Sequence, residues 1–206
     1  MPDLRARPFD VGDLDPDPLV LFRRWFEEAS ADEGFEANAV ALATVSAAGA
    51  PSARMVLMKS FDGRGLTFFT NYGSRKAVEL DENPRAALLF HWAGLGRQVR
   101  IEGEVERVGR EESVEYARSR SRASQLSALA SPQSLPVPDR AWLERRVAEL
   151  AEEHEGGEVP VRADWGGYRL APSAWEFWQD RADRLHDRFR FEPDGGGGWT
   201  SERLGP

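Results

Sequence analysis

The chain contains 206 residues, of which 41% are hydrophobic, 10% aromatic and 30% charged, so it can bury one sizeable core and is not wholly disordered. Its 27 Lys and Arg against 35 Asp and Glu give a net charge of -8, which disfavours nucleic acid and anionic membranes as partners. The absence of cysteine excludes disulfides, iron–sulfur clusters and cysteine zinc sites, and the three histidines are not spaced as metal ligands. We therefore expect a cytoplasmic protein without a metal, whose anionic ligands are held by local cations.

The first third of the chain predicts an arm, one helix and three strands. Residues 1–14 are charged and lack periodicity, which indicates a flexible N-terminal arm before a single domain over residues 15–206. Apolar side chains at Leu19, Phe22 and Trp25 recur at helical spacing and predict an amphipathic helix. Three strands separated by turn residues follow, over 39–46, 53–61 and 66–70.

The rest of the chain combines helices with antiparallel strands. The predicted helices are 74–82, 111–130 and 139–153. The predicted strands are 85–92, 97–108, 165–170, 173–179, 184–191 and 199–204. Because strands and helices do not alternate as βαβ units, the pattern argues against Rossmann and TIM architectures. The expected fold class is mainly β (α+β), a closed or partly closed β-barrel with peripheral helices.

The segment from Thr70 to Lys76 is a candidate anion site. It leads from a strand into a helix that begins after Ser74, and the N-terminus of a helix favours negative charge. Arg75 and Lys76 lie in the first turn, where cations are unfavourable unless an anion binds there. The residues alone fit a phosphate site and a solvated loop equally well.

The strand that contains Arg54 and Lys59 carries two cations on opposite faces. Alternation along a strand separates them by roughly 16 Å, too far for one small phosphate. They are either solvated surface cations or contacts of an elongated ligand or of two ligands.

Two further groups offer cations beside polar or aromatic groups. Tyr116, Arg120 and Ser124 share one face if the helix over 111–130 is continuous, although the sequence around them is also typical of a solvated helix end. Arg184, His186 and Arg188 would share one face of a strand, unless His186 is only structural. Together with the aromatic residues Phe69 and Trp178, these cationic groups suit a phosphorylated, planar ligand.

The chain resembles the pyridoxine/pyridoxamine 5'-phosphate oxidase family along nearly its whole length. The resemblance rests on the number and order of short motifs, each of them weak alone. They are RMVLMK (54–59), TNYGSRKA (70–77), NPRAALLF (83–90), RQVRIEGEVER (97–107), SRSRASQLSALASPQS (119–134), WGGYRL (165–170) and EFWQDRADRLHDRF (176–189).

The resemblance implies a split β-barrel of the FMN-binding type that works as a homodimer, with a dimerisation and substrate segment over about 165–206 and FMN between the subunits. The FMN contacts it implies are Arg54, Met55, Val56, Leu57, Met58, Lys59, Phe69, Thr70, Arg75, Lys76, Gln98, Gln133, Ser134, Trp178 and Arg188. The substrate contacts it implies are Lys59, Tyr116, Arg120 and Ser124 at the phosphate, and the catalytic Arg184 and His186 at the ring and reacting carbon. The implied reaction oxidises pyridoxamine or pyridoxine 5'-phosphate with dioxygen, and FMN carries the hydride.

Three departures from the family pattern stand out. Phe69 replaces a common tyrosine, Asp180 replaces a common glycine, and the arm has Arg5 or Arg7 but no tyrosine to cover the substrate. The alternatives are a related flavin oxidase of secondary metabolism, a deazaflavin-dependent reductase, or a non-catalytic flavin- or heme-binding module. The substrate-phosphate residues favour the oxidase of vitamin B6 phosphates over these.

Overall fold

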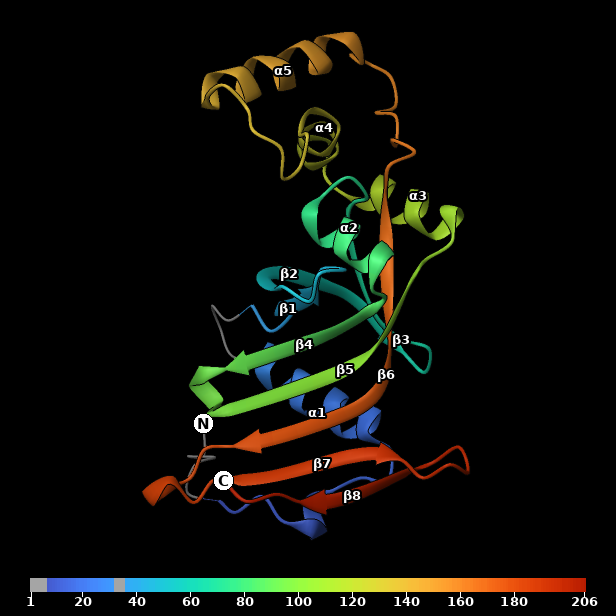
Figure 1. Ribbon diagram of the computed structural model, residues 1–206. Coiled ribbons are helices and arrows are strands. Elements are labelled where there is room, and N and C mark those ends of the chain that lie inside the picture. Colours follow the sequence, from blue (N-terminus) through green and yellow to red (C-terminus); the bar gives the residue numbers. More distant parts are fainter. Residues whose placement is uncertain (1–6, 32–35) are drawn as a thin grey trace.

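A computed structural model describes residues 7–31 and 36–206 (Figure 1). Six antiparallel strands follow one another in the order β3-β2-β1-β4-β5-β6, and β6 pairs with β3 to close a barrel. The strands are β1 (Ala39–Val45), β2 (Pro51–Asp62), β3 (Gly65–Asn71), β4 (Arg85–Trp92), β5 (Arg97–Arg107) and β6 (Trp165–Gln179). The expected mainly β barrel fold is confirmed.

Strand β6 belongs to the barrel and to a second, smaller sheet. Its first six residues pair with β3 and its last five with β7 (Asp187–Pro193), to whose edge β8 (Trp199–Arg203) is added. The β5–β6 register shifts at Gly103, where a Cβ atom would lie only 2.0 Å from the Ala171 carbonyl oxygen. The two strands predicted over 165–179 are therefore one continuous strand with a bulge in its pairing.

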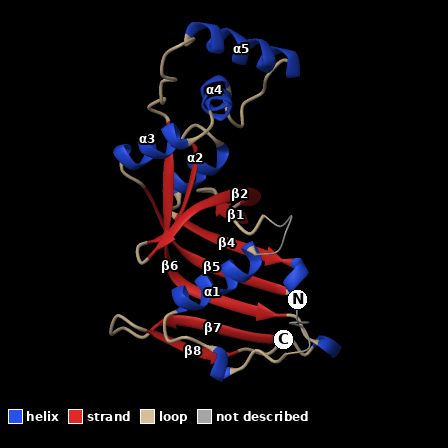
Figure 2. Ribbon diagram, turned by 180° about the vertical axis from the view of Figure 1, so that it is seen from behind, coloured by secondary structure: helices blue, strands red, loops and turns tan. Residues whose placement is uncertain are grey.

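Helix α1 (Pro18–Ser30) packs across one face of the sheet and supplies much of the core (Figure 2). The Asp17 side chain caps it by accepting a hydrogen bond from the Leu19 N–H at 2.9 Å. The Phe22 ring is fully buried and lies 5.1–6.2 Å from five other aromatic rings. This aromatic packing joins the helix to the barrel.

In the described part of the segment predicted as a flexible arm (1–14), Phe9 packs against α1 and β7. Phe9 is 5% exposed, and its ring lies 5.0 Å from Trp25 and 5.1 Å from Phe189. A 3₁₀ turn at Val11–Asp13 follows it. One aromatic residue in a charged segment gives no periodicity from which its burial could be predicted. Arg5, one of the two arginines considered as a cover for the substrate, lies outside the described residues.

The remaining helices lie at one end of the barrel (Figure 1). They are α2 (Arg75–Glu82), α3 (Arg110–Ser119), α4 (Arg122–Ala130) and α5 (Arg140–Glu153). The continuous helix predicted over 111–130 is wrong, because Arg120 has an extended backbone (φ -75°, ψ 155°) and Ser121 caps a new helix by accepting from the Ser124 N–H. Within the described residues, no helix is long and apolar enough to cross a membrane.

Candidate active site

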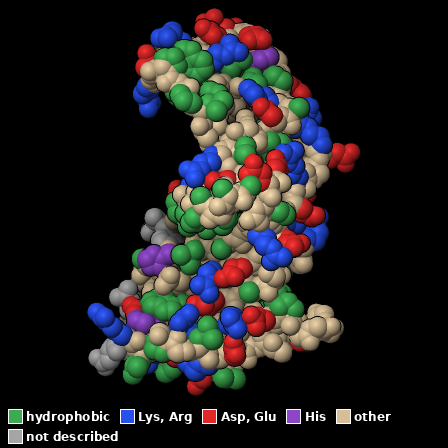
Figure 3. Space-filling view, in the orientation of Figure 1, with side chains coloured by type: hydrophobic (Ala, Val, Ile, Leu, Met, Phe, Trp, Pro, Cys, Tyr) green, Lys and Arg blue, Asp and Glu red, His purple; other side chains and the backbone are tan. Residues whose placement is uncertain are grey.

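The candidate site opens where two neighbouring strands of the barrel separate. Strands β2 and β3 pair from their shared turn up to Met58 and Phe68, after which β2 continues beside β1 and β3 continues beside β6. The separation contributes to a cleft of about 600 Å³ that is bordered by α2, α3 and α4. Figure 3 shows the surface hollowed between the barrel and the helical end of the molecule.

The cleft brings together many of the residues that the resemblance assigns to FMN and substrate. Those that line it are Arg54, Met55, Val56, Leu57, Lys59, Phe69, Thr70, Lys76, Tyr116, Arg120, Ser124 and Gln133. Burial alternates along β2 as expected for opposite faces, yet both Arg54 and Lys59 border the cleft. Met58 is 4% exposed and belongs to the hydrophobic core, so its side chain does not line the cleft.

Lys76 is a buried cation at the beginning of α2. Its side chain is oriented toward two hydroxyl groups, and Nζ donates to Thr70 Oγ1 at 3.1 Å and to Ser74 Oγ at 3.3 Å. Burial lowers the pKa of Lys76, and the positive charge of Arg54 lowers it further. Ser74 occupies the N-cap position, but its side chain makes no capping hydrogen bond. Within the described residues Lys76 has no carboxylate partner, so this end of the cleft is prepared for an anion.

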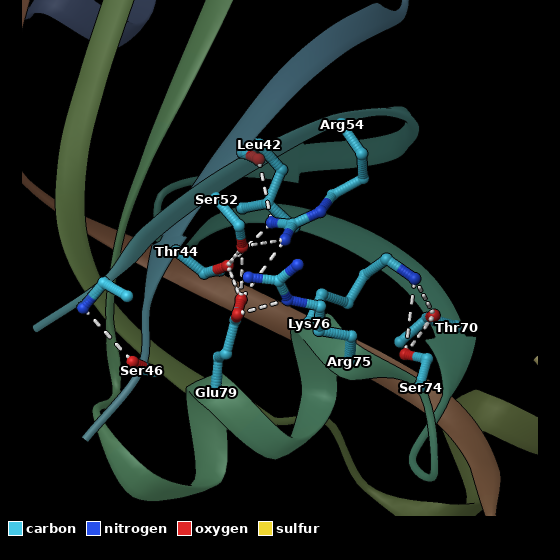
Figure 4. Close-up of polar contacts among 11 residues, drawn as sticks. Leu42, Thr44, Ser46, Ser52, Arg54, Thr70, Ser74, Arg75, Lys76 and Glu79 are labelled. Carbon is cyan, nitrogen blue, oxygen red and sulfur yellow. Dashed lines mark hydrogen bonds and ion pairs between the residues drawn. The ribbon is translucent and has the colours of Figure 1, made fainter. Parts of the chain in front are cut away.

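The Glu79 carboxylate lies between two guanidinium groups (Figure 4). Arg54 Nη2 donates to Oε2 at 3.2 Å, and Arg75 Nε donates to Oε1 at 2.8 Å. The hydroxyl groups of Thr44 and Ser52 also donate to Oε2, at 2.5 and 2.6 Å. Burial opposes ionisation of this carboxyl, but the hydrogen bonds from Ser52, Thr44 and Arg75 outweigh it and lower the pKa of Glu79 to about 2. Glu79 is therefore ionised at neutral pH.

Three stacked aromatic rings form a wall beside the cleft. The Phe69 and Tyr116 rings are 4.0 Å apart, and Trp165 lies 5.7 Å from Phe69 and 6.2 Å from Tyr116, all nearly parallel. Gly167 makes room for this arrangement, since a Cβ atom there would lie 2.8 Å from Phe69 Cε1. The Arg120 guanidinium lies 5.3 Å from the centre of the Trp165 ring. The wall therefore combines flat apolar surface with one cation.

The loop after α4 is tied to the edge of the cleft. Gln133 Oε1 accepts from Thr70 Oγ1 at 2.8 Å and from the Asn71 N–H at 3.1 Å. Ser134 follows in a left-handed conformation (φ 72°) and is exposed. Several residues that line the cleft were not predicted, because they resemble a core aromatic or a solvated polar helix; these are Asn71, Ser121, Ser127, Ala128, Ser131 and Trp165.

A second group of predicted residues lies at the far end of β6. Trp178 is the register partner of Gln98 on β5 and of Arg188 on β7, and its ring lies 4.6 Å from the His186 imidazole. Trp165, in the cleft, is 13 positions earlier on the same strand, which corresponds to roughly 40 Å of extended chain. The two groups therefore cannot contact one small ligand within a single chain.

The strand predicted over 184–191 begins later than expected, because a turn precedes β7. Residues Ala182–Arg184 form a 3₁₀ turn, and Arg184 has a left-handed backbone (φ 60°) that interrupts the extended chain. Strand β7 begins only after His186. The prediction that Arg184 and His186 share a strand face with Arg188 is therefore wrong.

His186 contacts Arg181 and Asp180, the second of which stands where the family commonly has glycine. Its Nδ1 accepts a hydrogen bond from the Arg181 N–H at 3.2 Å and lies 3.2 Å from Asp180 Oδ1. In the neutral imidazole this contact with the backbone places the proton on Nε2.

Two family models match the chain and together cover both groups of residues. Residues 26–154 match the family described as pyridoxamine 5'-phosphate oxidase. Residues 165–206 match the family described as the pyridoxine 5'-phosphate oxidase C-terminal dimerisation region. The chain belongs to the pyridoxamine 5'-phosphate oxidase family.

Similar proteins agree with this membership of the pyridoxamine 5'-phosphate oxidase family. The Ralstonia nicotianae protein named pyridoxine/pyridoxamine 5'-phosphate oxidase 1 is 54% identical over 205 residues, which cover 99% of this chain and 96% of the relative. The Bordetella pertussis pyridoxine/pyridoxamine 5'-phosphate oxidase is 55% identical over 190 residues, or 92% and 89% of the two chains.

Solved structures show the same fold. PhzG from Burkholderia lata, in complex with tetrahydrophenazine-1-carboxylic acid, has a TM-score of 0.87 at 34% identity and covers 100% of this chain and 97% of its own. A pyridoxamine 5'-phosphate oxidase-related, FMN-binding protein from Nostoc punctiforme has a TM-score of 0.73 at 17% identity, covering 92% and 98%. The second match supports the fold alone.

Proposed function

We propose that this protein is an FMN-dependent oxidase that converts pyridoxamine 5'-phosphate and pyridoxine 5'-phosphate to pyridoxal 5'-phosphate. The alcohol and dioxygen give the aldehyde and hydrogen peroxide. The amine, dioxygen and one water give the aldehyde, ammonia and hydrogen peroxide. In both cases the substrate loses two electrons and two protons, which reduce dioxygen. Relatives of this name at 54–55% identity support the proposal.

The buried Lys76 is the observation that carries the proposal. Lys76 is 8% exposed, and its ammonium group contacts two hydroxyl groups. Arg54 and Arg75 lie on the same side of α2. An unneutralised buried cation is costly unless a ligand supplies the opposite charge. A phosphate monoester meets this requirement, because it brings a charge near -2 and three acceptor oxygens.

The residues in the cleft fit FMN. Arg54 and Lys76, which line the cleft, would hold its phosphate together with Arg75, which is bound to Glu79. The cleft continues from Arg54 and Lys76 to the other β2 and β3 residues assigned to FMN. When bound, FMN supplies the two-electron acceptor for the substrate and is reoxidised by dioxygen. Four other residues that line the cleft would hold the substrate phosphate, and two phosphorylated ligands would account for the two cations on opposite faces of β2; these residues are Lys59, Tyr116, Arg120 and Ser124.

We further propose that each site is completed by a second copy of the chain. Met55, Ala41 and Leu89 are neighbours across three strands, and Met55 and Leu89 are 63% and 37% exposed. This apolar surface on the outside of the barrel suits burial against a partner. The match to a dimerisation region supports this assembly, in which the partner supplies Arg184 and His186.

Backbone strain also supports the assigned residues. Among the described residues other than glycine, only Ser134 and Arg184 have a positive φ, 72° and 60°. Both were assigned to the site from the resemblance. Residues in such costly conformations concentrate at functional sites, where surrounding contacts hold them.

The proposal is tested by anaerobic reduction of the purified protein. We expect bound flavin of the mass of FMN, and bleaching of its absorbance when pyridoxamine 5'-phosphate is added without oxygen. Protein that binds no flavin, or FMN that this substrate does not reduce, would refute the proposed function.

A flavin oxidase acting on a polycyclic carboxylic acid is the second candidate, because PhzG has a TM-score of 0.87 with this chain. The cations and hydroxyl groups that line the cleft in addition to those proposed for FMN favour a phosphorylated substrate instead. Reduction of the flavin by tetrahydrophenazine-1-carboxylic acid, and not by pyridoxamine 5'-phosphate, would select this candidate.

Replacing Arg75 by alanine is expected to weaken FMN binding roughly tenfold or more, the usual effect of losing a charge-assisted hydrogen bond. Arg75 Nε is bound to Glu79, while its side chain is 64% exposed and its terminal nitrogens can meet a phosphate. Quenching of flavin fluorescence on titration measures the Kd. Arg85→Ala, which removes an exposed arginine paired with Glu104, is the control. Unchanged FMN affinity in Arg75→Ala would remove Arg75 from the site.

Replacing Arg120 by alanine is expected to raise KM for pyridoxamine 5'-phosphate roughly 10- to 100-fold with little change in kcat. The reason is that a contact to the substrate phosphate is made equally in the ground and transition states. Steady-state oxygen consumption measures both constants. Arg118→Ala, an exposed arginine of α3 paired with Glu158, is the control. If KM stayed at the parental value, Arg120 would not be a phosphate ligand.

A further inference from the structure

Glu79 places a negative charge inside a site proposed to bind phosphate. The residue is only 4% exposed, and its carboxylate contacts both Arg54 and Arg75. It does not belong to the residues assigned to FMN or substrate. An acid in this position would repel a phosphate, so its burial there requires a reason.

The summed charge of Glu79 and the three cations around it suggests a reason for the burial of Glu79. Arg54, Arg75 and Lys76 carry three positive charges, and Glu79 subtracts one, which leaves +2. This sum is opposite to the charge of about -2 on a phosphate monoester at neutral pH. Without the carboxylate, three cations would share one partly buried site and repel one another until an anion arrived.

The hydrogen bonds show which donors Glu79 occupies. Both terminal nitrogens of Arg54 donate to protein acceptors. Nη1 donates to Leu42 O at 3.0 Å and to Thr44 Oγ1 at 2.7 Å. Nη2 donates to Glu79 Oε2 and to Ser52 Oγ. Arg75 binds Glu79 through Nε, and among the described residues no hydrogen bond engages its terminal nitrogens. The terminal donors of Arg54 are therefore all taken by protein acceptors, Glu79 among them, whereas Glu79 leaves the terminal nitrogens of Arg75 for a ligand.

We propose that Glu79 is an internal counter-ion of the phosphate site, which stabilises the protein without FMN and weakens its affinity for FMN. The inference rests on the proposed function, because it takes the FMN phosphate as the ligand. Charge removal should then have two effects of opposite sign. A residue that only supports the fold would change stability and affinity in the same direction.

The test compares Glu79→Gln with the parent protein and with Glu82→Gln, an exposed residue of the same helix. We expect the flavin-free variant to melt at a lower temperature than the parent. We expect its Kd for FMN to fall by about threefold to tenfold, because one charge that repels the phosphate is gone. Affinity for riboflavin, which lacks the phosphate, should not change. Glu82→Gln should match the parent in all three measurements.

The stabilisation by Glu79 should also depend on pH in a defined way. Its pKa is about 2 in the folded protein against an ordinary value of 4.5, so the stabilisation is complete above about pH 4.5. It is lost as the pH falls from 4.5 toward 2, where the folded protein also takes up the proton. The difference in unfolding free energy between parent and Glu79→Gln should therefore be constant near neutrality and shrink in acid.

Each outcome decides the question. Weaker FMN binding together with lower stability, or no change in either, would overturn the counter-ion role. If Glu79→Gln accumulates in cells only when FMN is supplied, the flavin-free protein needs the Glu79 carboxylate in order to fold. In that case the FMN-loaded variant is measured instead, and it should release FMN more slowly than the parent. Failure to fold even with FMN would contradict the proposal, since FMN should replace the missing charge. If the parent itself does not bind FMN, the proposed function fails instead.

Discussion

Heterodimers that combine an Arg120→Ala chain with an Arg184→Ala chain are expected to recover about half of the parental activity, although neither homodimer is active at low substrate concentration. Arg120 lines the cleft, whereas Arg184 lies in the turn beyond the far end of β6. If each site takes its cleft from one chain and its tail from the other, one of the two sites in this heterodimer is intact. Co-expression with two affinity tags isolates it.

The matched control contains the same two substitutions in one chain. A heterodimer of the Arg120→Ala/Arg184→Ala double variant with a parental chain should be inactive, because both of its sites then carry one change. If the site were built within one chain, the two heterodimers would exchange their behaviour.

Arg184→Ala alone should slow anaerobic flavin reduction roughly 100-fold at saturating substrate, since misplacement of the reacting carbon by about 1 Å costs that much.

Lys76→Met should weaken FMN binding and stabilise the flavin-free protein at the same time. Loss of a charged hydrogen bond to the phosphate costs about 1.5–3 kcal/mol, or roughly 10- to 150-fold in FMN affinity. Stability should rise, because burial and the charge of Arg54 lower the pKa of Lys76, so its charged form destabilises the fold. This destabilisation is complete at pH values below the lowered pKa and disappears as the pH rises from there toward 10.5, the ordinary value for lysine.

Flavin titration and thermal unfolding of the flavin-free protein measure the two effects of Lys76→Met. Riboflavin affinity should be nearly unchanged, which separates loss of the phosphate contact from damage to the rest of the cleft. A variant that keeps FMN at the parental affinity would show that the buried ammonium group does not bind the phosphate.

Most of the barrel could be predicted from alternation alone. The strand predicted over 85–92 is observed as Arg85–Trp92, and the strand predicted over 39–46 as Ala39–Val45. The errors occur where a single residue determines the local backbone conformation. Ser121 caps a new helix where periodicity runs on without interruption, and the left-handed Arg184 ends the extended chain where alternation would continue it.

The site could be predicted only in part. Arg75 and Lys76 are recognisable from their place at a helix start, because adjacent residues define that signal. Glu79 has no such signal, since its partners Thr44, Ser52 and Arg54 are 25 to 35 positions away and belong to β1 and β2. Trp165 resembles an ordinary core aromatic until the pairing of β3 with β6 places it beside Phe69.

The pairing of β3 with β6 determines when the protein can fold as it is synthesised. Strand β3 ends at Asn71, but its partner begins at Trp165, and the register joins Leu66 to Leu170. At about 5–20 residues per second, a ribosome needs roughly 5–20 seconds to make the intervening chain. During that time both edge strands of the nascent sheet, β3 and β5, lack their partner β6, and such edges recruit other strands. The barrel can therefore close only when the last fifth of the chain, which begins with β6, has emerged.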